Sequence, residues 1–273
     1  MPDTLQMLIE IALQEDIGSG DITTQALFGE DQGSKTGVVL AKQDLVLAGL
    51  DMMRRVFLTV DHHLHWKAYG QDGQWISKGT KVAEIFGRHQ SLLRAERTAL
   101  NFVQHLSGIA TLTRQYVEKV KKYSVKILDT RKTTPGLRLL EKQAVCAGGG
   151  SNHRMGLYDQ FLIKENHLQG RSITEAVARA KKFKKAPVEI EIERIDQIEE
   201  AIAAGVDTLL MDNFSPQELA KAVQQVRGRA KTEASGGIHL ENVEDFAKTG
   251  VGAISIGALT HSAGASDLSL EID

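Results

Sequence analysis

After residue 122 the sequence repeats one rhythm, in which a short apolar run is followed by a helix-like stretch. The apolar runs occupy residues 125–132, 159–166, 187–193, 207–213, 231–237 and 253–259. Amphipathic segments such as ITEAVARAKKFKK and SPQELAKAVQQVRGRA separate them. Because parallel strands need crossover helices, this alternation predicts a parallel sheet. The density of the units favours a closed or nearly closed α/β barrel, and a doubly wound open sheet is the alternative.

The residues before this region follow a different pattern. Apolar residues recur at helical spacing in residues 1–16, and β-rich runs in residues 36–88 predict a small, mostly antiparallel sheet. Residues 90–122 are predicted to be helical, with a break into two helices at Gly108. Arg97 lies inside the apolar stripe of this region, where a charge must snorkel, pair or meet a ligand.

Charge and cysteine content exclude several classes of function. The net charge of −2 gives no global positive field for nucleic acid, and no GxGxxG motif follows a strand to bind a dinucleotide. The single cysteine, Cys146, excludes an internal disulfide, and we interpret it as a buried apolar thiol. This cysteine content fits a reducing cytosol, and neither a signal peptide nor a membrane span is visible. We therefore expect a cytoplasmic protein with no membrane partner.

The histidines in HHLHW raise the question of a metal site. Alternation along a strand explains them better, because Leu64 and Trp66 would face the core while His63 and His65 face solvent. No further ligand at a useful spacing from His62 is visible. We therefore expect no metal at these histidines.

Charged residues follow most of the predicted strands. In an α/β barrel the active site forms at the carboxyl ends of the strands. Those ends, together with the loop GGGSNHR, carry Arg131, Lys132, His153, Arg154, Lys164, Glu165, Glu189, Glu191, Glu193, Asp212, Asn213, Ser235, Gly236, Gly237, Gly257 and Ala258. Because helices cover the outside of a barrel, the three glutamates are expected to point inward and to pair with cations.

These residue types suggest a chemistry. Clustered cations predict a substrate with several negative charges. Glu191 and Asp212, at neighbouring strand ends, predict magnesium or a developing positive charge. The glycines after the last two strands lie where such barrels bind phosphate. Together they indicate a phosphate-bearing sugar, a metal and a second anionic substrate, and the alternative is a purely structural ion network.

Motifs that run in order through nearly the whole chain resemble those of one family. They are EDIGSGDIT, ERTALNFVQHLSGIAT, DTRKTTPGLR, CAGGGSNHRMGLYD, LIKENH, EIEIE, LMDN, EASGGI and ISIGALTHS. Jointly they resemble the quinolinate phosphoribosyltransferases, the carboxylating nicotinate-nucleotide pyrophosphorylases of de novo NAD synthesis. The resemblance implies an enzyme that transfers phosphoribosyl from phosphoribosyl pyrophosphate to quinolinate with decarboxylation. The products would be nicotinate mononucleotide, pyrophosphate and carbon dioxide.

The resemblance also implies a fold and an assembly. An N-terminal α/β sandwich domain is expected in residues 1–108, and an incomplete α/β barrel of the type II phosphoribosyltransferases in residues 109–263. The tail, residues 264–273, is expected to return to the first domain. Relatives are homodimers or hexamers built as trimers of dimers, so Arg97 is expected to complete the site of a neighbouring subunit.

The family's site residues carry over by position. The carboxylates of quinolinate are expected to bind Arg97, Arg131, His153, Arg154 and Lys164. The residues expected to be catalytic are Lys132, Glu191 and Asp212, and the last two are expected to contact Mg²⁺ directly or through water. The expected contacts of phosphoribosyl pyrophosphate are Lys132, Lys164, Glu191, Asp212, Ser235, Gly236, Gly237, Gly257, Ala258 and His261. Glu165 stands where many relatives have aspartate, and keeps the charge with a longer reach.

Two rival interpretations stay open at the level of sequence. A related phosphoribosyltransferase of the molybdenum-operon type would share the fold, although intact Arg131, Arg154 and Lys164 favour a dicarboxylate substrate. A non-catalytic anion-binding protein would share the cations, but it has no use for acids such as Glu191 and Asp212. A carrier module is disfavoured, because no modifiable lysine stands in a tight turn between symmetric strands.

Overall fold

The computed structural model describes residues 4–29 and 33–273, which form two compact units. The first unit contains the chain up to Leu112, the short segment Cys146–Gly148 and the C-terminal segment Ala263–Asp273. The second contains Thr113–Val145 and Gly149–Ser262. The expected boundary at residue 108 lies inside helix α4 (His89–Val120), which passes from the first unit into the second. The assignment of the domains themselves stays a prediction.

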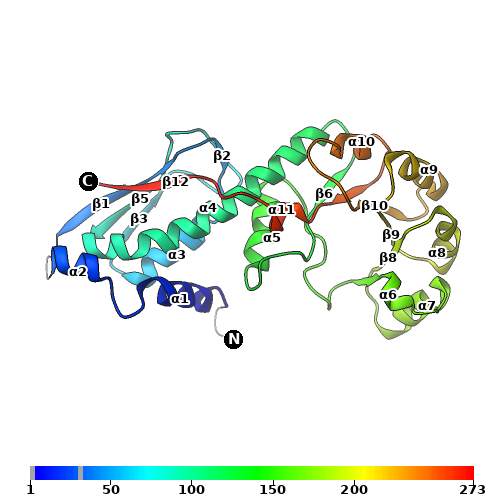
Figure 1. The fold of residues 1–273 in the computed structure, drawn as a ribbon, viewed down its shortest axis with the longest axis horizontal. Helices are drawn as coiled ribbons and strands as arrows, with labels where there is room; N and C mark the ends of the chain where they lie inside the picture. The colour runs from blue at the N-terminus through cyan, green and yellow to red at the C-terminus, as the bar shows by residue number, and fades with distance from the viewer. Residues whose placement is uncertain (1–3, 30–32) are drawn as a thin grey trace. The chain divides into compact units, whose positions relative to one another are not determined.

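The first unit is built on an antiparallel sheet with the strand order β12-β1-β5-β3. Its elements are α1 (Thr4–Ile17), α2 (Ile22–Phe28), β1 (Ser34–Ala41), β2 (Leu45–Val46), α3 (Leu50–Val60), β3 (His65–Ala68), β4 (Trp75–Ile76), β5 (Lys81–Arg88), the first part of α4 and β12 (Leu268–Ile272). Alternate residues such as Val39, Ala41 and Ile85 are fully buried, so one face of the sheet needs a cover. Figure 1 shows α3 and α4 running alongside this sheet.

Helix α3 corrects the expectation that residues 36–88 are composed of β-rich runs. Its buried residues Met52, Met53, Val56 and Phe57 recur every three or four positions, which is the period of a helix face. The predicted burial of this region is confirmed, although β3 begins only at His65 and so does not contain His63 or Leu64. Leu64 is buried and Trp66 half-buried, whereas His62, His63 and His65 are exposed.

Helix α4 does not break at Gly108, so that prediction is wrong. The helix is continuous over 32 residues, and Gly108 instead provides room for the C-terminal tail. A Cβ atom at Gly108 would lie 2.1 Å from the carbonyl oxygen of Gly264. The side chain of Gln104 donates to the carbonyl of Leu268 at 2.8 Å, one turn along the same helix. Strand β12 then pairs antiparallel with β1.

The second unit contains a six-stranded parallel sheet with the order β6-β11-β10-β9-β8-β7. Its elements are the end of α4, β6 (Lys126–Leu128), α5 (Arg138–Ala147), β7 (Phe161–Ile163), α6 (Glu165–Leu168), α7 (Ile173–Phe183), β8 (Val188–Ile192), the 3₁₀ turn η1 (Ile195–Gln197), α8 (Ile198–Ala204), β9 (Thr208–Asp212), α9 (Pro216–Val226), β10 (Lys231–Ser235), α10 (Val243–Ala247), β11 (Ala253–Ser255) and α11 (Ala258–His261). Strands β6 and β7 lie at opposite edges and do not pair, which confirms the incomplete α/β barrel. Figure 1 shows α7, α8 and α9 outside the strands.

Three further expectations about side chains are corrected. Cys146 is exposed, not buried, at the end of α5. Glu193 lies one residue beyond the end of β8 and is exposed, so it does not point into the barrel. Arg97 is exposed on α4, because the buried stripe runs through neighbours such as Ala95 and Ala99 instead.

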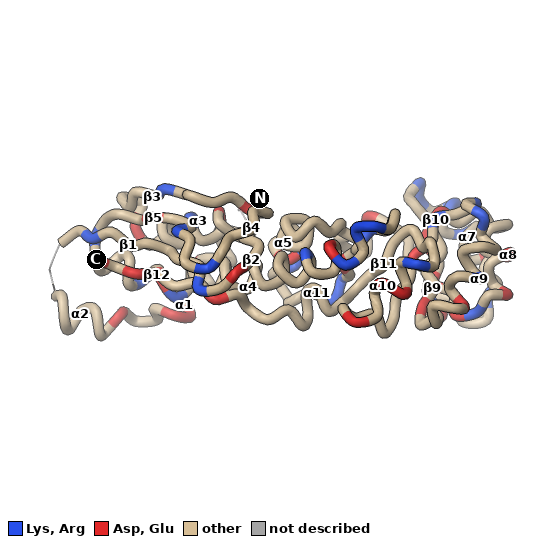
Figure 2. Tube along the Cα trace, turned by 90° about the horizontal axis from the view of Figure 1, so that it is seen from above, with Lys and Arg blue, Asp and Glu red and all other residues tan. Residues whose placement is uncertain are grey.

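The charges of the protein are distributed over both units. Figure 2 shows acidic and basic positions interspersed along the trace. Across residues 4–29 and 33–273, no helix combines the length and the apolar character needed to cross a bilayer.

Candidate active site

A polar cavity of about 260 Å³ lies at the carboxyl ends of the barrel strands. We call it the substrate cavity. Its lining residues are Thr130, Arg131, Lys132, His153, Arg154, Leu162, Lys164, Glu191, Leu210, Asp212, Glu233, Ser235 and Ser255. Parallel strands bring these ends together, since Asp212 and Ser235 are register partners at the ends of β9 and β10. The fold therefore gathers four cations and two of the expected acids at one place.

The cations of the substrate cavity are held in different ways. Lys164 forms an ion pair with Glu191, so these opposite charges neutralise each other when no ligand is bound. Arg154 is only 9% exposed, and its Nη1 donates to the carbonyl of Gln160 at 3.2 Å. Burial, followed by the nearby charge of Arg131, lowers the pKa of Arg154. A buried cation beside a second cation is a favourable site for a carboxylate.

A fully buried ion pair fixes the two loops that carry these cations. Lys142 on α5 pairs with Asp129, which directly follows β6, and both side chains are 0% exposed. Asp129 also accepts from the backbone N–H of His153 at 2.9 Å, and Lys142 donates to the carbonyl of His153 at 3.0 Å. The segment that presents His153 and Arg154 is therefore attached to the start of the Arg131 loop. Neither Lys142 nor Asp129 was among the residues predicted for the site, because their pairing joins α5 to the end of β6 and has no signal in local spacing.

His153 faces two buried acids. Its Nε2 lies 3.1 Å from Oε2 of Glu189 and 3.4 Å from Oε1 of Glu233. Gln160 also donates from Nε2 to Glu189, at 2.8 Å. Burial by itself would lower the pKa of His153, but the hydrogen bond to Glu189 and the two negative charges raise it. Burial and then the charge of Glu189 raise the pKa of Glu233 to about 7.

The loop after β10 makes a close turn beside β9. Gly236 and Gly237 both have positive φ, at 92° and 62°, a conformation that side chains rarely adopt. A Cβ at Gly236 would lie 2.1 Å from Oδ1 of Asn213, so only glycine fits there. Ser235 precedes this turn, and its carbonyl accepts from the N–H of Asn213 at 2.8 Å. Such a glycine turn exposes backbone N–H groups that can hold a phosphate.

The remaining predicted residues lie around or away from this cavity. Gly257 and His261 flank Lys132, because a Cβ at Gly257 would lie 3.0 Å from Cδ of Lys132 and 3.1 Å from Nε2 of His261. Thr260 on α11 donates to the carbonyl of Lys132 at 2.7 Å. Ala258 begins α11, and Glu165 is exposed at the start of α6. Arg97 belongs to the other compact unit.

The residues expected to hold magnesium have suitable donor atoms. Glu191 and Asp212 offer carboxylate oxygens at neighbouring strand ends and line the same cavity. Mg²⁺ in proteins typically binds one or two carboxylates and completes its shell with water and substrate phosphates. Two carboxylates without histidine or thiolate partners fit that pattern.

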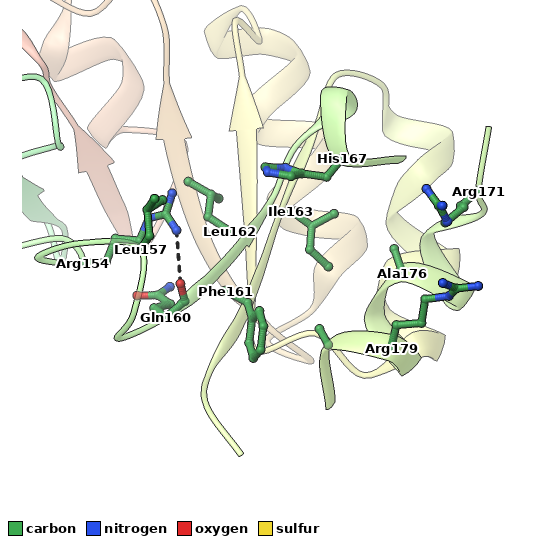
Figure 3. A pocket seen from close by; sticks show the side chains of 11 residues that line it. Arg154, Leu157, Gln160, Phe161, Leu162, Ile163, His167, Arg171, Ala176 and Arg179 are labelled. Atoms are coloured by element: carbon green, nitrogen blue, oxygen red, sulfur yellow. Dashed lines mark hydrogen bonds between the residues drawn. The ribbon is translucent and has the colours of Figure 1, made fainter. Parts of the chain in front are cut away.

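A second cavity of about 350 Å³ adjoins the edge strand β7 and helix α7. Figure 3 shows its lining, with Arg154 and Gln160 joined by their hydrogen bond and Arg171 and Arg179 at the opposite side. Leu162 and Arg154 line both the edge cavity and the substrate cavity, and Arg154 is the charged residue of the two. Its guanidinium thus lies in the wall between them.

Comparisons with known proteins agree with each other. The description "Quinolinate phosphoribosyl transferase, N-terminal domain" matches residues 21–107, and the corresponding C-terminal domain matches residues 109–271. The chain is 44% identical to a probable carboxylating nicotinate-nucleotide pyrophosphorylase of Bacillus subtilis, over 98% of this chain and 93% of that protein. The solved nicotinate-nucleotide pyrophosphorylase of Francisella tularensis superposes with a TM-score of 0.95 at 40% identity, covering 99% of this chain and 96% of that one. NadC from Streptococcus pyogenes gives a TM-score of 0.95 at 39% identity, with coverages of 100% and 98%.

Proposed function

The chain belongs to the quinolinate phosphoribosyltransferase family, and from this membership we propose how its own residues perform the family reaction. It is a pentosyltransferase of NAD biosynthesis. It transfers the phosphoribosyl group of phosphoribosyl pyrophosphate to quinolinate with decarboxylation. The single observation that supports the assignment of roles is that four cations and the acids Glu191 and Asp212 line one cavity.

Quinolinate carries two carboxylates, and we assign them to the cationic side of the cavity. Arg131, Arg154 and Lys164 are the cations, and the buried guanidinium of Arg154 is the most desolvated of them. When a carboxylate takes Lys164, Glu191 loses its resting ion pair and becomes available to the other substrate. Binding of quinolinate would thereby prepare the sugar site. His153 supports this arrangement, because Lys142 and Asp129 hold its backbone. Its ring faces the acids Glu189 and Glu233.

The sugar substrate is assigned to the acidic side and to the glycine turns. Glu191 and Asp212 would stabilise the positive charge that develops on the ribose carbon, and Lys132 would lie between the two substrates. Ser235, Gly236, Gly237, Gly257, Ala258 and His261 would hold the phosphate. Magnesium, held by Glu191 and Asp212 directly or through water, would supply positive charge for the departing pyrophosphate. Holding two anionic substrates in register is the main contribution of the protein.

We further propose a homodimer or a hexamer of three dimers, in which Arg97 serves the site of a neighbouring subunit. Arg97 is exposed on α4, so a long flexible cation is available there. The cytoplasm is the compartment that the single cysteine favours.

A crossed binding experiment tests this division of the cavity. Replacing Arg131 by alanine is expected to weaken quinolinate binding by about tenfold or more, because a charge-assisted contact is lost. The same change should leave the affinity for phosphoribosyl pyrophosphate with Mg²⁺ within about twofold. Asp212→Asn is expected to give the reverse pattern, and calorimetric titration of both variants with both ligands measures it. Equal losses for the two ligands in either variant would contradict the proposed division.

A further inference from the structure

The buried group formed by His153, Glu189 and Glu233 lies between two cavities of the barrel. One is the substrate cavity at the carboxyl ends of the strands, which His153 and Glu233 both line. The other, of about 670 Å³, is lined by residues at the amino ends, such as Lys126, Thr208, Lys231 and Ala253. His153, Glu189 and Glu233 line that amino-end cavity as well. The group therefore forms the partition across the middle of the barrel.

Hydrogen bonding indicates protons, and not a metal ion, inside this group. The three side chains are of a type that could hold a metal, and their donor atoms lie within 4.8 Å of one another. However, Nδ1 of His153 accepts from the N–H of Arg154 at 2.7 Å, so the ring proton is on Nε2. A metal ion could bind Nε2 only through a lone pair, and this nitrogen carries the proton instead. A histidine that binds a metal normally carries its N–H on the other ring nitrogen and donates a hydrogen bond from it. The Nε2–H group instead faces the two carboxyl groups.

Two buried acids remain with a single histidine proton between them. Glu189 is 1% and Glu233 4% exposed, and Oε1 of each is buried without a hydrogen bond among the described residues, although Oε1 of Glu233 lies 3.4 Å from Nε2 of His153. Two carboxylates so close in a buried site do not both ionise readily. One additional proton shared by the pair would give both orphaned oxygens a partner. Glu233 is the member of the pair that lines the substrate cavity, and burial together with the charge of Glu189 raises its pKa, so we assign the shared proton to Glu233.

The reaction requires a proton at a defined atom. When the 2-carboxylate leaves as carbon dioxide, its bonding electron pair stays on the ring carbon, which must then form a C–H bond. Among the residues that line the substrate cavity, the hydroxyl, lysine and arginine side chains are weak acids. Glu191 and Asp212 are assigned to the sugar and its metal. Glu233 and His153 are the acids that remain, and the ring proton of His153 is already directed to Glu189.

We propose that Glu233 donates the proton that replaces the departing carboxylate on the pyridine ring. The carbon–carboxylate bond breaks, carbon dioxide leaves without the electron pair, and the ring carbon takes the proton from the carboxyl group of Glu233. Glu233 is left as a carboxylate beside the Nε2–H of His153. A proton from water in the amino-end cavity restores the acid, so the proton path does not cross the substrate. This inference rests on the proposed function, because it concerns the decarboxylation step.

A single-turnover experiment separates this step from the sugar transfer. Enzyme in excess is mixed with phosphoribosyl pyrophosphate, Mg²⁺ and quinolinate labelled in its 2-carboxylate, and pyrophosphate and labelled carbon dioxide are followed together. The variants are Glu233→Gln, which keeps the shape without the acid, Glu233→Asp, which keeps an acid, and Glu193→Gln as an exposed control. Glu233→Gln is expected to release pyrophosphate within about twofold of the wild-type rate. Its release of carbon dioxide is expected to slow by about 10²-fold or more, so that quinolinate mononucleotide accumulates.

The pH dependence gives a second readout that a purely structural role would not change. The groups that face Glu233 are Glu189 on β8, His153 on its loop and Ser255 on β11, and Lys142 acts on His153 from α5. Since the protonated form is the donor, wild-type carbon dioxide release should decline as the pH rises through about 7. The decline should be absent in Glu233→Gln and present in Glu233→Asp.

Each outcome decides the inference. If pyrophosphate and carbon dioxide slow by the same factor in Glu233→Gln, or if neither slows, Glu233 is not the donor. If that variant does not fold, wild-type carbon dioxide release that is flat from about pH 6 to about pH 8 overturns the inference. A wild-type enzyme that releases no pyrophosphate with quinolinate would instead contradict the proposed function.

Discussion

Replacing Arg154 by lysine is expected to lower kcat/KM for quinolinate by about 10²-fold, although the charge is kept. Arg154 is 9% exposed, and one arm of its guanidinium is held by the carbonyl of Gln160 at 3.2 Å. The planar fork can bind that carbonyl and a carboxylate at the same time. A lysine ammonium lacks this geometry, and it would be buried beside the charge of Arg131. Steady-state kinetics with each substrate varied in turn measures the effect.

The matched control for this variant is Arg179→Lys. Arg179 lines the edge cavity of Figure 3, but it is exposed on α7 and pairs with Glu175 at 2.8 Å. It should retain kcat/KM within about twofold, since exposed ion pairs contribute little. If Arg154→Lys also stays within about threefold of the wild type, the dicarboxylate does not depend on the Arg154 fork.

Replacing Lys142 by methionine is expected to have the largest effect on stability, a loss of about 3–5 kcal/mol in the free energy of unfolding. The change leaves Asp129 as a fully buried carboxylate without its cation. Burial already raises the pKa of Asp129, and Lys142 is the main group that opposes this rise. Denaturant unfolding monitored by circular dichroism measures the loss. Activity should fall as well, because the same pair fixes the backbone of His153.

A second substitution distinguishes the buried charge from the lost packing. The double variant Lys142→Met with Asp129→Asn removes both charges, and it should recover at least about half of the lost stability. Lys121→Met is the control, since Lys121 pairs with Glu118 on an exposed surface. A Lys142→Met variant that unfolds within about 1 kcal/mol of the wild type would contradict the role assigned to the pair.

Much of the barrel could be predicted because its signals are local. Each strand is an apolar run with flanking polar residues, and parallel pairing then places residues such as Lys164, Glu191 and Asp212 at the same edge. All six expected strands are present in the sheet. The exposure of Glu193 was missed because β8 ends at Ile192, so the alternation that would give Glu193 the same direction as Glu191 stops one residue before it.

The features that could not be predicted depend on contacts between distant parts of the chain. Glycine weakens helices, so Gly108 was expected to end one. The lack of a side chain at Gly108 instead leaves room for the backbone of Gly264. In the sequence, Lys142 looks like an ordinary residue of an amphipathic helix. Its ion pair with Asp129 forms only when the fold brings the end of β6 next to α5. Likewise, no local pattern shows that His153 turns toward Glu189. These are packing relations, and a single sequence carries no spacing rule for them.

Turnover of quinolinate and phosphoribosyl pyrophosphate together is the decisive test of the proposed activity. The purified protein is incubated with quinolinate, phosphoribosyl pyrophosphate and Mg²⁺, and carbon dioxide and nicotinate mononucleotide are measured together. We expect equimolar formation of both products, and neither product when nicotinate replaces quinolinate. Mononucleotide formation from nicotinate, or the absence of any product with quinolinate, would contradict the proposed activity.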